Sequence, residues 1–144
     1  MFLRDILNAK GTVVHTIDAE ASLEDVVQTL VRHNCGSLVV FEKSSSRRMV
    51  GIVTERDILR ACAAHKAALS QLRVADAMSP NLVVGSPGDS VEDTMGLMTD
   101  KRIRHLPVVE DDQLLGLVSI GDVVKMQHDR LTMENHYLKS YLQS

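Results

Sequence analysis

A hydroxyl and a carboxylate three residues apart occur twice in this chain, each time directly after a short apolar run that begins with glycine. Thr54 and Asp57 form the first copy, and Ser119 and Asp122 form the second. At the start of a helix, unpaired N–H groups and the positive end of the dipole favour an anion such as phosphate. A carboxylate only accepts hydrogen bonds, so its two oxygens can take both hydroxyls of a sugar diol. The spacing therefore fits the phosphate and the ribose of a nucleotide.

The same spacing is also a capping motif, in which the hydroxyl and the carboxylate satisfy the backbone of their own helix. For a single copy, capping is the simpler interpretation. The repetition of the motif in register favours a binding function. The two copies differ in charge, because Arg56 lies inside the first and Gly121 takes its position in the second.

A second group of charged residues lies between an expected helix and an expected strand. Lys101 and Arg102 suit the negative end of a helix dipole. Arg104 and His105 fall beyond that helix and can project from a rim. The matching stretch of the first copy, residues 34–37, has no cation. The pattern predicts two pseudo-symmetric clefts with unequal affinity for anions.

The repeat includes the elements that must position these residues. Ser22 and Ser90 each begin a helix with apolar positions on one face, and Asp25 is placed to reach back to its cap. Each repeat then has two apolar runs around a polar loop, which predicts a hairpin. Both halves have the order β-α-β-β-α. The expected elements are a helical turn at 2–8, strands at 13–17 and 82–84, hairpins at 37–53 and 106–119, and helices at 23–33, 54–67, 91–98 and from 122 onward.

Composition limits the possible functions. The chain has 144 residues, of which 44% are hydrophobic, enough for two small halves that bury a face against each other. A net charge of −3 and an aromatic content of 3% give no footprint for nucleic acid or an anionic membrane. Cys35 and Cys62 form neither a disulfide framework nor a metal-ligand pattern, so no metal is expected. No run approaches a membrane span and the N-terminus has no signal sequence, so a cytoplasmic location is expected.

Taken together, the two Gly-led motifs, the Ser-capped helices and Arg104-His105-Leu106-Pro107 resemble a pair of CBS domains. The resemblance implies an α+β fold of two tandem β-α-β-β-α modules, packed sheet to sheet about a pseudo-twofold axis. The expected boundaries are 1–67 for the first module, 68–80 for a linker, 81–130 for the second module and 131–144 for a C-terminal helix. The chain is also similar to stand-alone bacterial CBS pairs and to the regulatory insert of inosine monophosphate dehydrogenase, without that enzyme's barrel.

The resemblance also implies adenosine ligands such as AMP, ATP, NAD(H) or S-adenosylmethionine, bound in two clefts. The first cleft would use Thr54, Arg56 and Asp57 with Ile103, Arg104 and His105. The second would use Ser119, Gly121 and Asp122 with Cys35, Gly36 and Ser37. The backbone around Val14 to Thr16 and around Leu82 to Val84 would line the adenine pockets. Because cations suit a phosphorylated ligand, AMP or NAD(H) is expected in the first cleft.

These features predict a regulatory adenine-nucleotide sensor that acts on another, unidentified protein and catalyses nothing itself. No phosphate-binding loop, nucleophile elbow or zinc-protease helix is present in the sequence. The alternative is a structural dimerisation module that binds no ligand. Leu131, Leu138 and Leu142 form one stripe on the expected C-terminal helix, which either packs on its own domain or forms the seam of a homodimer.

Overall fold

The computed structural model describes residues 1–43, 48–80 and 82–143, and the serine-rich loop expected at 44–47 lies outside this range. The chain forms two compact units. We call Val14–Leu82 the first unit and Met1–Val13 with Val83–Ser144 the second unit, and describe each by itself.

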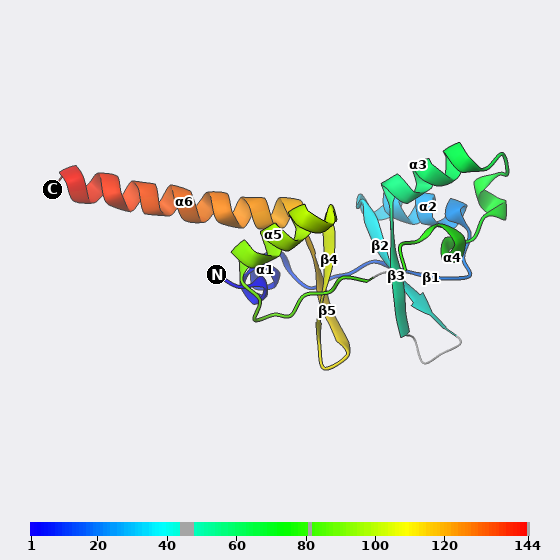
Figure 1. Cartoon of the computed structure of the whole chain (residues 1–144), viewed down its shortest axis with the longest axis horizontal. Coiled ribbons are helices and arrows are strands. Elements are labelled where there is room, and N and C mark those ends of the chain that lie inside the picture. Colours follow the sequence, from blue (N-terminus) through cyan, green and yellow to red (C-terminus); the bar gives the residue numbers. More distant parts are fainter. Residues whose placement is uncertain (44–47, 81, 144) are drawn as a thin grey trace. The chain divides into compact units, whose positions relative to one another are not determined.

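The first unit is a three-stranded sheet covered by helices (Figure 1). The strand order is β1-β2-β3, with β1 parallel and β3 antiparallel to the central strand. Its elements are β1 (Thr16–Asp18), α2 (Leu23–His33), β2 (Ser37–Glu42), β3 (Arg48–Thr54), α3 (Glu55–Ala64), the short 3₁₀ helix η1 (Leu69–Gln71) and α4 (Val74–Ala77). Leu23, Val26, Leu38 and Val53 are fully buried at the centre of its core.

Local sequence explains where α2 begins and ends. The Ser22 hydroxyl accepts a hydrogen bond from the Asp25 amide at 3.1 Å, and the Asp25 carboxylate accepts one from the Ser22 amide at 3.3 Å. This is the reciprocal capping box that the sequence predicts. The helix ends at Asn34, whose left-handed backbone (φ 50°) is one that asparagine tolerates well.

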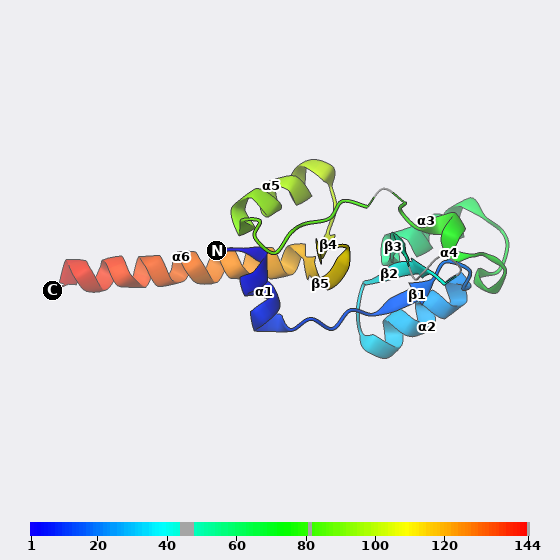
Figure 2. The same cartoon turned by 90° about the horizontal axis from the view of Figure 1, so that it is seen from below.

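The second unit has a two-stranded sheet and the helices α1, α5 and α6 (Figure 2). Its elements are α1 (Leu3–Lys10), α5 (Val91–Lys101), β4 (His105–Glu110), β5 (Gln113–Ser119) and α6 (Ile120–Gln143). Its core includes the buried Leu3, Met98, Leu106, Val118 and Val123. The distal part of α6 extends beyond the other elements of its unit in both views. Among the described residues, no helix combines the length and apolar character needed to cross a bilayer.

The N-terminal helix packs with the second repeat, whereas the expected boundary assigned residues 1–67 to the first. Leu3 is fully buried in the core of the second unit. In the first unit, the matching place is filled by Val74 of α4, inside the stretch expected to be a linker. The segment before the first repeat therefore packs with the second, and the segment before the second repeat packs with the first.

Both hairpins are confirmed, with β2–β3 and β4–β5 pairing antiparallel. Other expectations need correction. The strand expected at 13–17 covers Thr16–Asp18, α3 ends at Ala64 instead of continuing to 67, and the described part of the expected 131–144 helix is a continuation of α6.

The strand expected at 82–84 is not formed; only an isolated bridge joins Gly85 to Val108. Pro107 explains the difference. In the first repeat, the amide of Val39 donates to the carbonyl of His15 at 3.2 Å. Pro107 stands at the position of Val39 and has no N–H, so the ladder loses that bond.

Candidate functional site

In the first unit, Thr54 and Asp57 form a capping box at the start of α3. Asp57 Oδ2 accepts hydrogen bonds from the Thr54 amide at 2.9 Å and from its hydroxyl at 3.1 Å. The Asp57 side chain is only 7% exposed, and its Oδ1 lies 4.0 Å from the guanidinium of Arg60. The capping interpretation is therefore correct for Oδ2. Among the described residues, Oδ1 makes this longer contact with Arg60, and a carboxylate oxygen can accept further hydrogen bonds.

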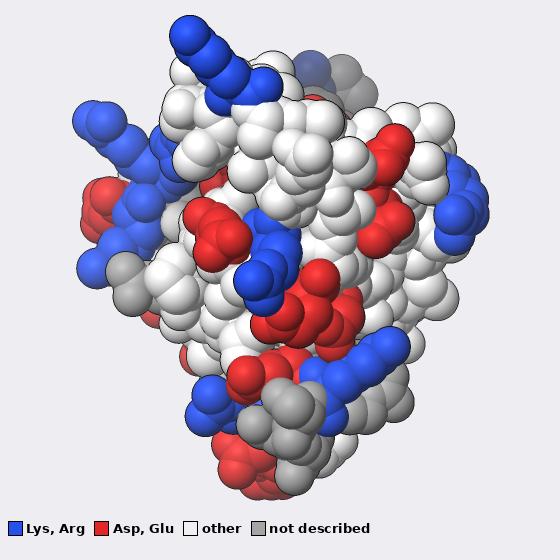
Figure 3. Space-filling model, turned by 90° about the vertical axis from the view of Figure 1, so that its right-hand side faces the viewer, with Lys and Arg blue, Asp and Glu red and all other residues white. Residues whose placement is uncertain are grey.

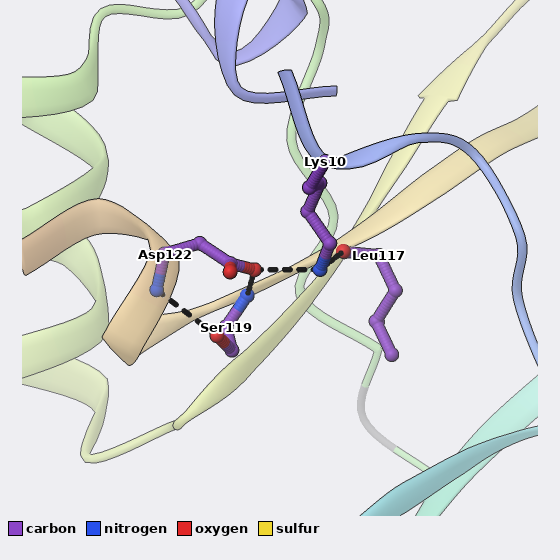
Figure 4. A network of polar contacts seen from close by, with 4 residues as sticks. All are labelled: Lys10, Leu117, Ser119 and Asp122. Carbon is purple, nitrogen blue, oxygen red and sulfur yellow. Dashed lines mark hydrogen bonds and ion pairs between the residues drawn. The ribbon is translucent and has the colours of Figure 1, made fainter. Parts of the chain in front are cut away.

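The second unit repeats this arrangement at the start of α6. Asp122 Oδ2 accepts from the Ser119 amide at 2.8 Å, and the Asp122 amide donates to the Ser119 hydroxyl at 3.1 Å. Here a cation joins the carboxylate (Figure 4). Lys10 Nζ lies 2.6 Å from Asp122 Oδ2 and donates to the Leu117 carbonyl at 2.9 Å. The sequence interpretation missed Lys10, because it aligned the N-terminal stretch with the first repeat.

The pKa of Asp122 reflects these contacts. Partial burial favours the neutral acid and would raise the pKa. The hydrogen bonds and charge of Lys10, together with the bonds from Ser119, outweigh burial and hold the pKa below its ordinary value. Asp122 is therefore a carboxylate with a counter-ion from its own chain.

The predicted residues gather at equivalent places in the two units. In the first unit, the Glu55 amide donates to the Gly36 carbonyl at 3.1 Å, and Ser37 pairs with Thr54. The loop of Cys35, Gly36 and Ser37 thus lies beside Thr54, Arg56 and Asp57. In the second unit, the Ile120 amide donates to the Arg104 carbonyl at 2.8 Å, and His105 pairs with Ser119. Ile103, Arg104 and His105 thus lie beside Ser119, Gly121 and Asp122. The pairing of residues across the two units stays a prediction.

Of the residues expected to line adenine, Thr16 lies in the edge strand β1, whereas Val14 and Val84 lie outside the strands. Thr16 pairs with Val39 on β2, and Val14 precedes β1. Val84 is 44% exposed beside the bridge at Gly85.

Two of the expected cations are available to an anion. The side chains of Arg56 and Arg104 are both exposed, and within the described ranges neither guanidinium forms an ion pair. Over the face in Figure 3, basic and acidic side chains alternate instead of forming one extended patch of a single sign. On that face, an anion would therefore meet individual cations and no extended basic patch.

A hollow of about 180 Å³ lies within the first unit, between α3 and the η1–α4 segment. Asp57, Arg60, His65, Arg73 and Asp76 provide its polar lining. Arg73 is already paired with Glu20 at 2.7 Å. Across the described residues, no group of three or more His, Cys, Asp or Glu side chains is arranged to hold a metal ion.

The family model described as "CBS domain" matches residues 3–64 and 74–129, so the chain belongs to the CBS domain family. CBS domain proteins are in general regulatory ligand-binding modules. The crystal structure of the CBS-domain protein ATU1752 from Agrobacterium tumefaciens is 38% identical, with a TM-score of 0.83 over 88% of this chain and 99% of that one.

Two sequence relatives indicate the settings in which this module occurs. The mitochondrial CBS domain-containing protein CBSX3 of Arabidopsis thaliana is 33% identical over 98% of this chain and 71% of its own length. Inosine-5'-monophosphate dehydrogenase of Nitrosopumilus maritimus is 30% identical over 76% of this chain, a match that spans 21% of that enzyme. The resemblance to a stand-alone CBS pair and the α+β tandem fold are therefore confirmed.

Proposed function

We propose that this chain is a regulatory sensor of adenine nucleotides, AMP or NAD(H), with no reaction of its own, and that it acts on another protein. The observation that carries the proposal is the buried carboxylate of Asp57 at the start of α3, beside the exposed Arg56, which forms no ion pair with the described residues. A diol acceptor and a phosphate cation within one helical turn match the two polar ends of a nucleoside monophosphate.

The cations favour a phosphorylated ligand over S-adenosylmethionine. Arg56 lies in the first turn of α3, where the backbone N–H groups also attract an anion. Arg104 is the second exposed cation of the predicted first cleft, and it would reach the ligand from the other unit. S-adenosylmethionine has no phosphate for either guanidinium to bind.

The decisive variant is Asp57→Asn, with Asp25→Asn as its matched control. Both substitutions remove the charge of a capping-box carboxylate, and because Asp25 is exposed whereas Asp57 is buried, Asp57→Asn should cost at least as much stability as Asp25→Asn, about 1 kcal/mol or more. The proposal assigns the diol to Asp57 and not to Asp25, so Asp57→Asn should weaken AMP or NADH binding by roughly 10- to 100-fold, whereas Asp25→Asn should not. Isothermal titration calorimetry with AMP, ATP, NADH and S-adenosylmethionine measures this directly. Unchanged affinity in Asp57→Asn would refute the assignment of Asp57 to ribose.

The exposed distal part of α6 favours a second candidate, a homodimerisation module. Leu131, Leu138 and Leu142 are 63%, 57% and 81% exposed on one helical stripe. A projecting helix of this kind is marginal in water unless its apolar face is covered. A second copy of the chain offers the same stripe, so two copies can cover each other.

Sedimentation velocity tests this second candidate. Leu138→Glu should convert a dimer to a monomer, because it places a charge in the buried seam. Ser140→Glu adds the same charge to the same helix away from the stripe and should leave the dimer intact. A dimer that binds none of the nucleotides would favour the interaction module over the sensor.

A further inference from the structure

Lys10 makes the two halves of this protein unequal in a way that the repeat does not predict. Its ammonium is fixed by two acceptors, Asp122 Oδ2 at 2.6 Å and the Leu117 carbonyl at 2.9 Å (Figure 4). Charge-assisted hydrogen bonds of this length are among the stronger ones in proteins. Lys10 therefore holds a defined position at the corner between β5 and α6.

The corresponding position in the first unit has a different chemistry. Among the described residues, the only ion pair of Asp57 is with Arg60, at 4.0 Å. That guanidinium comes from the next turn of the same helix, and its side chain is 70% exposed. The nearest cation to Asp57 among the described residues is thus 4.0 Å from Oδ1, whereas Asp122 carries an ammonium at hydrogen-bond distance from Oδ2, the oxygen that also caps the helix.

Backbone donors do not explain the difference between the two carboxylates. Asp57 Oδ2 accepts from the Thr54 amide at 2.9 Å, and Asp122 Oδ2 accepts from the Ser119 amide at 2.8 Å. Both helices therefore use one carboxylate oxygen for the same cap. What distinguishes the second copy is a cation supplied by α1, from far away in the sequence.

We propose that Lys10 is an internal occupant of the second ribose position, so that the protein binds one ribonucleotide per chain at Asp57 and rejects ribosyl ligands at Asp122. This inference rests on the proposed nucleotide-binding function. A ribose diol that uses both oxygens of Asp122 must displace the ammonium from Oδ2 or share that oxygen with it, and the ammonium also offsets the charge that would attract the hydroxyl donors. Gly121 replaces the arginine of the first copy, so the first turn of α6 has no cation to attract a phosphate, and Lys125 lies one turn further along.

Removal of the ammonium should open the second position. In Lys10→Met, Asp122 loses the ammonium from Oδ2, and that oxygen keeps its hydrogen bond from the Ser119 amide while becoming accessible to a hydroxyl of a diol. Adenosine is the suitable probe there, because it has the diol and carries no phosphate that the uncompensated carboxylate would repel. We expect Lys10→Met to gain an adenosine site at least about tenfold tighter than any binding at that position in the unmodified protein.

Two matched variants separate occupancy from a general change of charge. Lys10→Arg keeps a long cationic side chain at the same position and should keep the site closed. Lys139→Met removes one positive charge from an exposed position on distal α6 and should leave the stoichiometry unchanged. The double variant of Lys10→Met with Asp122→Asn should lose the gained site, which locates it at Asp122.

The experiment counts bound AMP and adenosine per chain by titration calorimetry, with circular dichroism to check that each variant is folded. One ligand in the unmodified protein and two in Lys10→Met support the inference. Two equivalent ligands per chain in the unmodified protein would overturn it. So would an unchanged or a smaller number of bound ligands per chain in Lys10→Met. No binding in the unmodified protein but one site in Lys10→Met would support the exclusion by Lys10 and refute the proposed site at Asp57, so the two failures are distinguishable.

Discussion

Gly116 is the position where the packing of the N-terminal helix onto the second repeat can be tested. A Cβ atom added at Gly116 would lie 2.6 Å from Leu7 Cδ2 and 3.2 Å from Leu7 Cδ1. Leu7 is 5% exposed and packs in the core of the second unit. Gly116→Ala should therefore push α1 away from β5.

The magnitude follows from how far Leu7 must move. Its methyl group must shift by nearly 1 Å to restore ordinary contact, within a core that has little free volume. Overpacking of this kind typically costs about 1–3 kcal/mol. Leu7→Ala alone should cost about 2–5 kcal/mol, because it removes a buried leucine side chain.

The double variant is the informative one. In Leu7→Ala with Gly116→Ala, the truncated side chain leaves room for the new methyl group. The combined loss should be smaller than the sum of the two single losses by about 0.5–3 kcal/mol. Urea denaturation of the four proteins, followed by circular dichroism, measures this coupling.

Gly51 in the first repeat provides the contrast. A Cβ there would lie 2.7 Å from Met78 Sδ and 2.8 Å from the Ser79 carbonyl oxygen. That backbone is held by hydrogen bonds with Ile52 in both directions. Met78→Ala should therefore rescue Gly51→Ala only partly. Strictly additive losses for Leu7 and Gly116 would refute the packing of α1 against β5.

Three further outcomes are expected. The pKa of His33 lies below its ordinary 6.5 because of desolvation and the charges of His15 and Arg32, and the His15 ring stacks on it with the centroids 3.8 Å apart. At acidic pH the folded protein then binds fewer protons at His33 than the unfolded chain. The free energy of unfolding therefore has its full value above pH 6.5 and decreases as pH falls below it. Below neutral pH, the urea unfolding midpoint of His33→Gln should depend less steeply on pH than that of the unmodified protein. An unchanged slope would contradict this. Arg102 has a left-handed backbone with φ 54°, so Arg102→Gly should stabilise the protein by about 0.5–1 kcal/mol in the same assay, whereas a loss would contradict the strain. Pro107→Val restores the backbone N–H donor that proline lacks, so the amide of residue 107 should be protected from hydrogen exchange. The free energy of unfolding should rise by about 0.5–1.5 kcal/mol. Rapid exchange at residue 107 would argue against the edge-strand explanation.

Much of each unit was predictable from sequence, because the signals are local. Ser22 with Asp25, and Thr54 with Asp57, specify helix starts through contacts three residues apart. The two hairpins follow from apolar runs on either side of polar loops. The missing strand at 82–84 could also have been anticipated, since Pro107 cannot donate to an edge neighbour.

The site was predictable only as a pair of motifs. Asp57 and Asp122 have the same spacing to their hydroxyl partners, and sequence alone gives them the same role. Their surroundings differ because Lys10 pairs with Asp122, across 112 residues of chain, whereas Asp57 meets only Arg60 at the limit of ion-pair distance. No periodicity or spacing rule connects residues so far apart.

The sequence by itself determined the repeat, the caps, the hairpins and the carboxylate at each helix start, because all of these depend on neighbours along the chain. Tertiary structure decided which repeat receives the N-terminal helix, and therefore where Lys10 lies. Leu3 and Val74 are both apolar residues at the start of short helices, and only the shape of each core selects between them. That selection places a cation on Asp122 and leaves Asp57 open, which is a property of packing and not of the motif.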